Sequence, residues 1–129
     1  MHNYIQQIHS FGISHKDAAV DIRETFSLSF DQAEYLYKRK ADFNIHECYI
    51  LSTCNRTEFY AVCDDMKILR DFIISGYSQL EKSIDIESLT HLYGSDCIHH
   101  LMHVSAGMDS MMLGETQITA QIKSSFSHA

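Results

Sequence analysis

The sequence contains no proline and no tryptophan, and only five glycines. The glycines are isolated, so neither G-x-G-x-x-G nor G-x-x-x-x-G-K occurs, and we expect no loop of this chain to bind a dinucleotide or a triphosphate. No apolar run approaches the roughly 18 residues of a membrane-spanning helix. The N-terminus also lacks the basic start and apolar run of a secretory signal, which favours a cytoplasmic location.

Cysteine is scarce as well: the sequence has four, and none form a C-x-x-C pair. Without a secretory signal, this pattern indicates reduced thiols rather than a disulfide framework. The net charge of −7 argues against a general nucleic-acid binder. A length of 129 residues with 45% hydrophobic content fits one domain with its own core.

Apolar periodicity and capping residues predict an α+β fold. We expect strands at residues 4–13, 45–53, 57–63 and 89–93, and helices at residues 17–24, 29–40 and from 64–65 onward. Ser29 and Gln32 have the form of a capping box. The order is the ferredoxin-like βαββαβ arrangement, for which we expect an antiparallel sheet with helices on one face.

Two C-terminal helices are expected to follow, so that residues 1–93 form the βαββαβ part and residues 94–129 the helical part. The first should run from residue 95 or 96 to about residue 106, where Gly107 ends it. The second carries Ile118, Ile122 and Phe126 at helical spacing and has no stop signal. An apolar stripe that simply stops indicates a chain cut from a longer one.

Between two predicted strands lies one thiol, Cys54, followed at once by Asn55 and Arg56. A nucleophile at such a joint is held by rigid elements and yet remains reachable. Arg56 can stabilise the thiolate or bind a substrate carboxylate through its planar fork. The competing interpretation is a small buried hydrophobe at a strand end, the usual state of a free cysteine.

Two further clusters of polar residues do not indicate a single function by themselves. His99 and His103 are spaced i, i+4, which can hold zinc, but no matched C-x-x-C or H-E-x-x-H supplies further ligands. The alternatives are one histidine that faces the thiol, or ordinary surface histidines. Ser110, Glu115 and Gln117 lie around the start of the last predicted helix, where they can bind an amine or hydroxyl or simply cap the helix.

Taken together, three segments resemble glutamyl-tRNA reductase over the whole chain. They are residues 12–24, residues 51–60 and residues 100–118. The sequence departs from the family pattern at Ser14, where asparagine is usual, and at Ala19 and Thr116, where proline is usual. We expect these departures to change local rigidity rather than chemistry.

The resemblance implies the N-terminal catalytic domain, residues 1–129, of an NADPH-dependent oxidoreductase of tetrapyrrole (5-aminolevulinate, porphyrin) biosynthesis. In that family a cysteine attacks glutamyl-tRNA to form a thioester, which NADPH reduces to glutamate-1-semialdehyde. By position, Cys54 is then the nucleophile and His100 the residue that assists with acid–base catalysis. The residues implied to bind the glutamyl group are Thr53, Asn55, Arg56, Ser110, Glu115, Thr116, Gln117 and Gln121.

The resemblance also implies that the NADPH-binding and dimerisation domains are absent from this chain, so alone it should perform only acyl transfer or hydrolysis. The implied partners are glutamyl-tRNA, a second subunit in the full-length enzyme and glutamate-1-semialdehyde aminomutase, with no membrane and no metal. Two other functional classes compete with this interpretation. A zinc-binding regulatory module would contain stoichiometric zinc, and a noncatalytic RNA-binding domain would carry a basic, aromatic sheet face.

Overall fold

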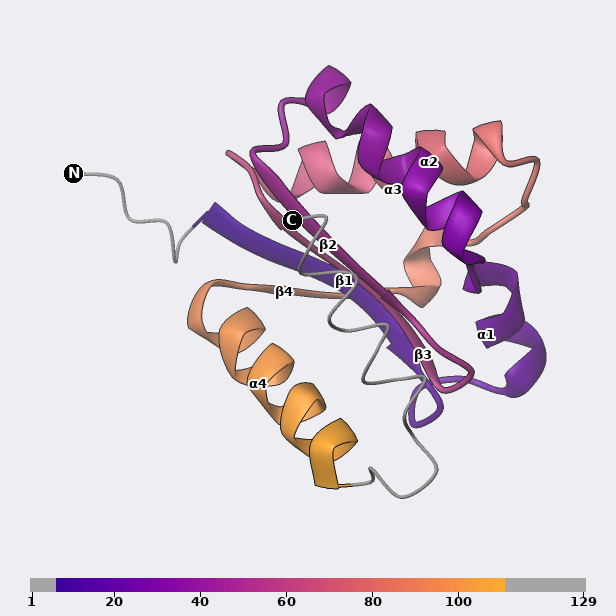
Figure 1. Cartoon of the computed structure of the whole chain (residues 1–129), viewed down its shortest axis with the longest axis vertical. Coiled ribbons are helices and arrows are strands. Elements are labelled where there is room, and N and C mark those ends of the chain that lie inside the picture. Colours follow the sequence, from indigo (N-terminus) through magenta and orange to yellow (C-terminus); the bar gives the residue numbers. More distant parts are fainter. Residues whose placement is uncertain (1–6, 111–129) are drawn as a thin grey trace.

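The computed structural model describes residues 7–110, and the side chains of residues 7–106. Its sheet has four strands, β1 (Ile8–Ser14), β2 (Glu47–Ser52), β3 (Arg56–Val62) and β4 (Thr90–Tyr93). They lie in the order β2-β3-β1-β4, and every neighbouring pair is antiparallel. The predicted ferredoxin-like α+β arrangement is therefore confirmed (Figure 1).

Three helices, α1 (Val20–Phe26), α2 (Phe30–Arg39) and α3 (Met66–Gln79), pack on one face of this sheet. Two short 3-10 helices, η2 (Lys40–Phe43) and η3 (Ile86–Ser88), lie in the connections. The predicted capping box is confirmed, because the Ser29 hydroxyl accepts from the Gln32 amide and the Gln32 side chain accepts from the Ser29 amide. Asp65 caps α3 in the same way, by accepting from the amide of Ile68 at 3.2 Å.

Strand alternation determines which side chains face these three helices. Residues of β1, β2 and β3 that point towards α1–α3 form the main core together with buried side chains of the helices. Its largest fully buried members are Tyr77, Phe26, Phe59, Phe72, Ile13, Leu36, Leu69 and Ile73. Helices α2 and α3 approach closely at Gly76, where an added Cβ would collide with the Leu36 side chain.

The fourth helix, α4 (Gly94–Ser110), covers the opposite face of the sheet (Figure 1). Its residues Cys97 and Val104 pack against Tyr49, Leu51 and Tyr60 in a second, smaller core. The sheet is thus buried between α1–α3 on one side and α4 on the other.

Two predicted helix boundaries are wrong. Helix α4 continues through Gly107 to Ser110. A glycine inside a helix lowers its stability by only about 1 kcal/mol relative to alanine, and this cost is too small to end α4 at Gly107. Helix α1 begins at Val20 rather than at Asp17, because the Asp17 carboxylate accepts the backbone N–H of Ser14 at 3.2 Å and holds residues 14–17 in a turn. The predicted helix from residue 116 lies outside the described residues.

Candidate active site

The β2–β3 connection is a tight hairpin tip, residues 53–56. The Thr53 amide donates to the Arg56 carbonyl at 2.8 Å. The Thr53 hydroxyl accepts from the amides of Asn55 at 3.1 Å and Arg56 at 3.2 Å. One threonine side chain therefore organises the turn that presents Cys54.

The hairpin tip is also held from outside by the segment that follows β1. The Arg23 Nη1 atom donates to the Cys54 carbonyl at 3.0 Å, and the His15 amide donates to the Asn55 carbonyl at 2.8 Å. Arg23 is itself fixed, because its Nε donates to the Ala18 carbonyl at 3.2 Å. The backbone beneath the thiol is thus anchored on two sides.

Cys54 is exposed, whereas Cys48, Cys63 and Cys97 are buried. Burial raises the pKa of Cys48 to about 12 and that of Cys63 to about 11, and it also raises the pKa of Cys97. Because the thiolate is the nucleophilic form, these three cysteines are poor nucleophiles at neutral pH. Cys54 is the one cysteine placed to react with a molecule from solvent.

Glu58, on β3 two residues beyond Arg56, is a carboxylate with only 3% exposure. Its Oε2 atom lies 2.6 Å from His100 Nε2 on α4, within hydrogen-bond distance, and 3.4 Å from Arg56 Nη1. Its Oε1 atom accepts from the Tyr60 hydroxyl at 2.9 Å. We call these four residues, Arg56, Glu58, Tyr60 and His100, the Glu58 network.

The position of Glu58 depends on Gly12 in the neighbouring strand. The two residues are directly opposite each other in the β1–β3 register. A Cβ on Gly12 would lie 2.9 Å from Glu58 Cγ and 3.4 Å from its Oε2. Glycine at this position therefore leaves the space that the buried glutamate fills.

Sequence reasoning missed Glu58, although a signal was present. Glu58 precedes the apolar and aromatic run of residues 59–62 and shares one face of the strand with Arg56 and Tyr60. Burial together with the neighbouring carboxylate raises the pKa of the Tyr60 phenol, so Tyr60 remains a hydrogen-bond donor. A buried charge needs such partners, because an unpaired one would be costly.

Beside the Glu58 network lies a cavity of about 250 Å³. It is lined by Ser10, Phe11, Gly12, Asp17, Glu58, Tyr60, Thr90, Leu92 and His100. Asp17 is held at this wall by Ser14, whose amide and hydroxyl each donate to its Oδ2 at 3.2 Å. The departure at Ser14 thus retains a hydrogen-bonding side chain at the β1 end.

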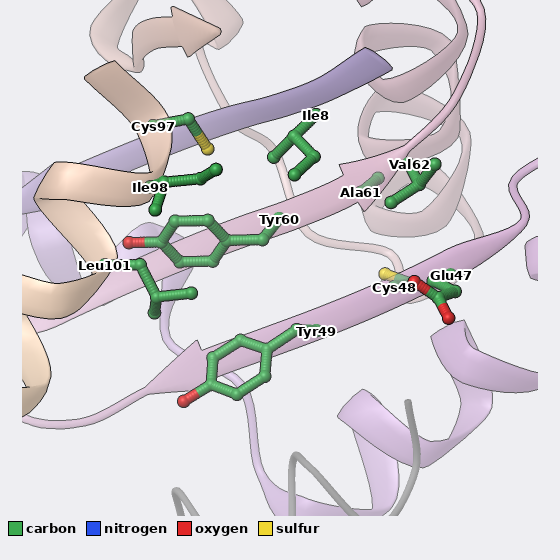
Figure 2. Close-up of a pocket in the computed structure, with 10 residues that line it drawn as sticks. All are labelled: Ile8, Glu47, Cys48, Tyr49, Tyr60, Ala61, Val62, Cys97, Ile98 and Leu101. Atoms are coloured by element: carbon green, nitrogen blue, oxygen red, sulfur yellow. The ribbon is translucent and has the colours of Figure 1, made fainter. Parts of the chain in front are cut away.

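A second cavity, of about 190 Å³, opens between the β2 edge and α4 (Figure 2). Tyr49 and Tyr60 project from neighbouring strands towards Cys97 and Leu101 of α4. Glu47 is the one charged residue of its lining. Because almost no polar group converges there, the cavity beside Glu58 is the better candidate for chemistry.

The structure brings some of the predicted site residues together. Arg56 and His100 meet at Glu58, and Thr53, Cys54 and Asn55 form the adjoining hairpin tip. Cys54 is not part of the lining of the 250 Å³ cavity, and its catalytic assignment stays a prediction. The side chain of Ser110, and residues Glu115, Thr116, Gln117 and Gln121, lie outside the described residues.

His99 and His103 are exposed on α4. Among the described residues, no three histidine, cysteine, aspartate or glutamate side chains are grouped so that they could hold a metal ion. Within residues 7–110, no helix combines the length and apolar character needed to cross a membrane.

Comparison with known proteins gives a consistent result. Residues 11–129 match the family model described as the N-terminal domain of glutamyl-tRNA(Glu) reductase. The chain is 42% identical over 122 residues to a glutamyl-tRNA reductase of Brevibacillus brevis, covering 89% of this chain and 26% of that protein. It is 39% identical over 123 residues to the Bacillus subtilis protein of the same name, covering 92% and 27%.

A solved structure shows the same fold. The glutamyl-tRNA reductase from Methanopyrus kandleri superposes with a TM-score of 0.69 at 30% identity, covering 96% of this chain and 28% of that one. The chain spans about a quarter of the length of the curated relatives it matches.

Proposed function

The chain belongs to the family of glutamyl-tRNA reductase N-terminal domains, and on this basis we propose that it forms a thioester with the glutamyl group of glutamyl-tRNA. Residues 1–129 are then the catalytic domain of a larger cytoplasmic oxidoreductase of tetrapyrrole biosynthesis. The substrate is an aminoacyl ester, and the reaction of this domain is acyl transfer to a thiol.

In the proposed reaction, the Cys54 thiolate attacks the ester carbonyl of glutamyl-tRNA. A C–S bond forms, the C–O bond to the terminal ribose breaks, and the ribose oxygen leaves with a proton. His100 carries that proton as a general acid–base group. A thiolate suits this step because it is strongly nucleophilic even when only a small fraction of the thiol is ionised.

Substrate binding is assigned to the groups around the thiol. Arg56 is proposed to bind the side-chain carboxylate of the glutamyl group, with Thr53 and Asn55 at the same hairpin tip. Ser110, Glu115, Thr116, Gln117 and Gln121 complete the proposed pocket, with Glu115 facing the substrate ammonium.

Reduction of the thioester by NADPH, giving glutamate-1-semialdehyde, is proposed for a part of the longer relatives that this chain does not span. The residues here do not fit the cofactor, because the sequence has no glycine-rich loop for its phosphates. The homodimer and the aminomutase partner likewise belong to the proposal for the complete enzyme.

One observation carries the proposal: the exposed thiol of Cys54 lies on an anchored hairpin tip, two residues before the arginine that, together with His100, contacts the buried Glu58. That combination gives an accessible nucleophile two residues from a cation, and the carboxylate bound by this cation is also bound by an imidazole. Such a grouping is typical of a catalytic site rather than of a structural cysteine.

The test is brief exposure of the purified chain to glutamyl-tRNA, acid quenching and mass spectrometry of the cysteine-containing peptides. We expect a glutamyl adduct on Cys54 and none in Cys54→Ser. Cys63→Ser is the matched control, because its hydroxyl can replace the Cys63 Sγ donor to the Asp65 carbonyl. An adduct that persists in Cys54→Ser, or no adduct in the wild type, overturns the proposal.

A further inference from the structure

The hydrogen bond between His100 and Glu58 determines which ring nitrogen of His100 carries a hydrogen. His100 Nε2 lies 2.6 Å from Glu58 Oε2. An ionised carboxylate only accepts hydrogen bonds, so Nε2 must be the donor. In the neutral ring, Nδ1 is then the nitrogen with the free lone pair.

Glu58 is held firmly enough by its neighbours to orient the His100 ring. Its side chain is 4% exposed, its second oxygen accepts from the Tyr60 hydroxyl, and Arg56 compensates its charge at 3.4 Å. The absence of a side chain at Gly12 leaves room for the methylene groups of Glu58, since a Cβ on Gly12 would lie 2.9 Å from Glu58 Cγ. By contrast, His100 is 37% exposed and would otherwise be free to rotate its ring.

We propose that Glu58 is a positioning residue that holds His100 in the Nε2–H tautomer, so that Nδ1 exchanges protons with the reacting groups. The role of the proton exchange rests on the proposed thioester chemistry, whereas the tautomer itself rests on the Glu58 contact alone. Glu58 does not contact the substrate in this proposal. It acts through His100 on one side and through Arg56 on the other.

The proton transfers balance in this arrangement. Nδ1 accepts the Cys54 thiol proton as the sulfur attacks, which makes His100 an imidazolium with Nε2–H still donating to Glu58. The same Nδ1 proton then passes to the ribose oxygen as its bond to carbon breaks. The buried carboxylate stabilises the transient imidazolium, as the orienting carboxylate does in other nucleophile–histidine sites.

The first test is spectroscopic and needs no substrate. NMR of the ¹⁵N-labelled chain resolves the ring nitrogens of each histidine and any ring proton that exchanges slowly with solvent. The His100→Gln variant assigns the signals of His100. We expect His100 to show a protected Nε2–H proton and an unprotonated Nδ1. In Glu58→Gln the charged acceptor is lost, and this proton should exchange rapidly or shift strongly.

The matched control is Glu47→Gln, the same chemical change at an exposed glutamate on the β2 edge of the same sheet. Its His100 signals should equal those of the wild type. An Nδ1–H tautomer in the wild type overturns the proposal. So does a Nε2–H signal that is unchanged in a folded Glu58→Gln protein.

The second test measures the rate of glutamyl adduct formation on Cys54. Glu58→Gln should lower the rate at least about 10-fold at saturating substrate, which is less than the roughly 10²–10⁴-fold cost of losing acid–base catalysis because His100 itself is retained, whereas Glu47→Gln should not lower it. An unchanged rate contradicts the positioning role. If the wild type forms no adduct, the proposed function fails, and the NMR result still decides whether Glu58 sets the tautomer.

Discussion

Replacing Gly12 by alanine tests the space that Gly12 leaves for Glu58. The new Cβ would lie 2.9 Å from Glu58 Cγ and 3.5 Å from its Cβ. Carbon atoms prefer separations of about 3.5–4.0 Å, so the two groups must move apart by at least about 0.5 Å. The atom that is struck is near the backbone of a buried strand, which leaves little room to rotate away.

Two opposing terms determine how much Gly12→Ala lowers the free energy of unfolding. Overpacking of this kind costs roughly 1–3 kcal/mol, and removing a glycine from a strand interior returns roughly 0.5–1 kcal/mol. The net effect on the free energy of unfolding is a loss of about 0–2.5 kcal/mol. For a domain of this size the melting temperature should fall by about 3–5 °C per kcal/mol.

The assay combines thermal unfolding by circular dichroism with the His100 ring signals. We expect Gly12→Ala to melt earlier and also to lose the protected Nε2–H proton. Gly76→Ala is the control, because its Cβ collides with Leu36 on the other side of the sheet and should lower stability without altering His100. A Gly12→Ala protein of wild-type stability with unchanged His100 signals would refute the reasoning.

Three further outcomes are expected. Iodoacetamide at neutral pH should modify the folded chain at Cys54 alone, because burial suppresses the other thiols; peptide mapping that shows a second site in folded protein would contradict this. Arg23→Met should slow adduct formation on Cys54 while costing no more than about 3 kcal/mol in urea unfolding, because it removes two hydrogen bonds to carbonyls, each worth about 0.5–1.5 kcal/mol. Burial lowers the pKa of both His9 and His91 below their usual 6.5, so the unfolded state binds more protons. Stability should therefore be full above about pH 6.5 and fall as pH drops towards 5, with a smaller fall in His91→Asn; equal unfolding free energies at the two pH values would oppose this.

The elements of the fold were predictable because their signals are local. The Ser29 capping box, the Asp65 cap and the apolar runs of the strands each act within a few residues, and the structure has all of them. Given two βαβ halves, the antiparallel ferredoxin-like order follows from the topology. The helix boundaries near Gly107 and Val20 were less predictable. The first depends on the small energetic cost of a glycine inside a helix, and the second on one turn held by the Asp17 carboxylate.

The site was predictable only in part. The exposure of Cys54 followed from its position between two strands. Glu58 was missed, because its partner His100 is 42 residues away and sequence alone does not say that α4 crosses the face on which Glu58 lies. A carboxylate in a strand indicates a buried site only when the element that packs on its face of the sheet is known.

The placement of α4 on the far face of the sheet also sets an order of assembly during synthesis. Glu58 is added to the nascent chain 42 residues before His100. At about 5–20 residues per second, this interval lasts roughly 2–8 s. During that time Glu58 has no histidine partner and the aromatic face of Tyr49 and Tyr60 has no cover, so a chain stalled before α4 should expose both tyrosines while its Cys54 thiol already reacts with iodoacetamide.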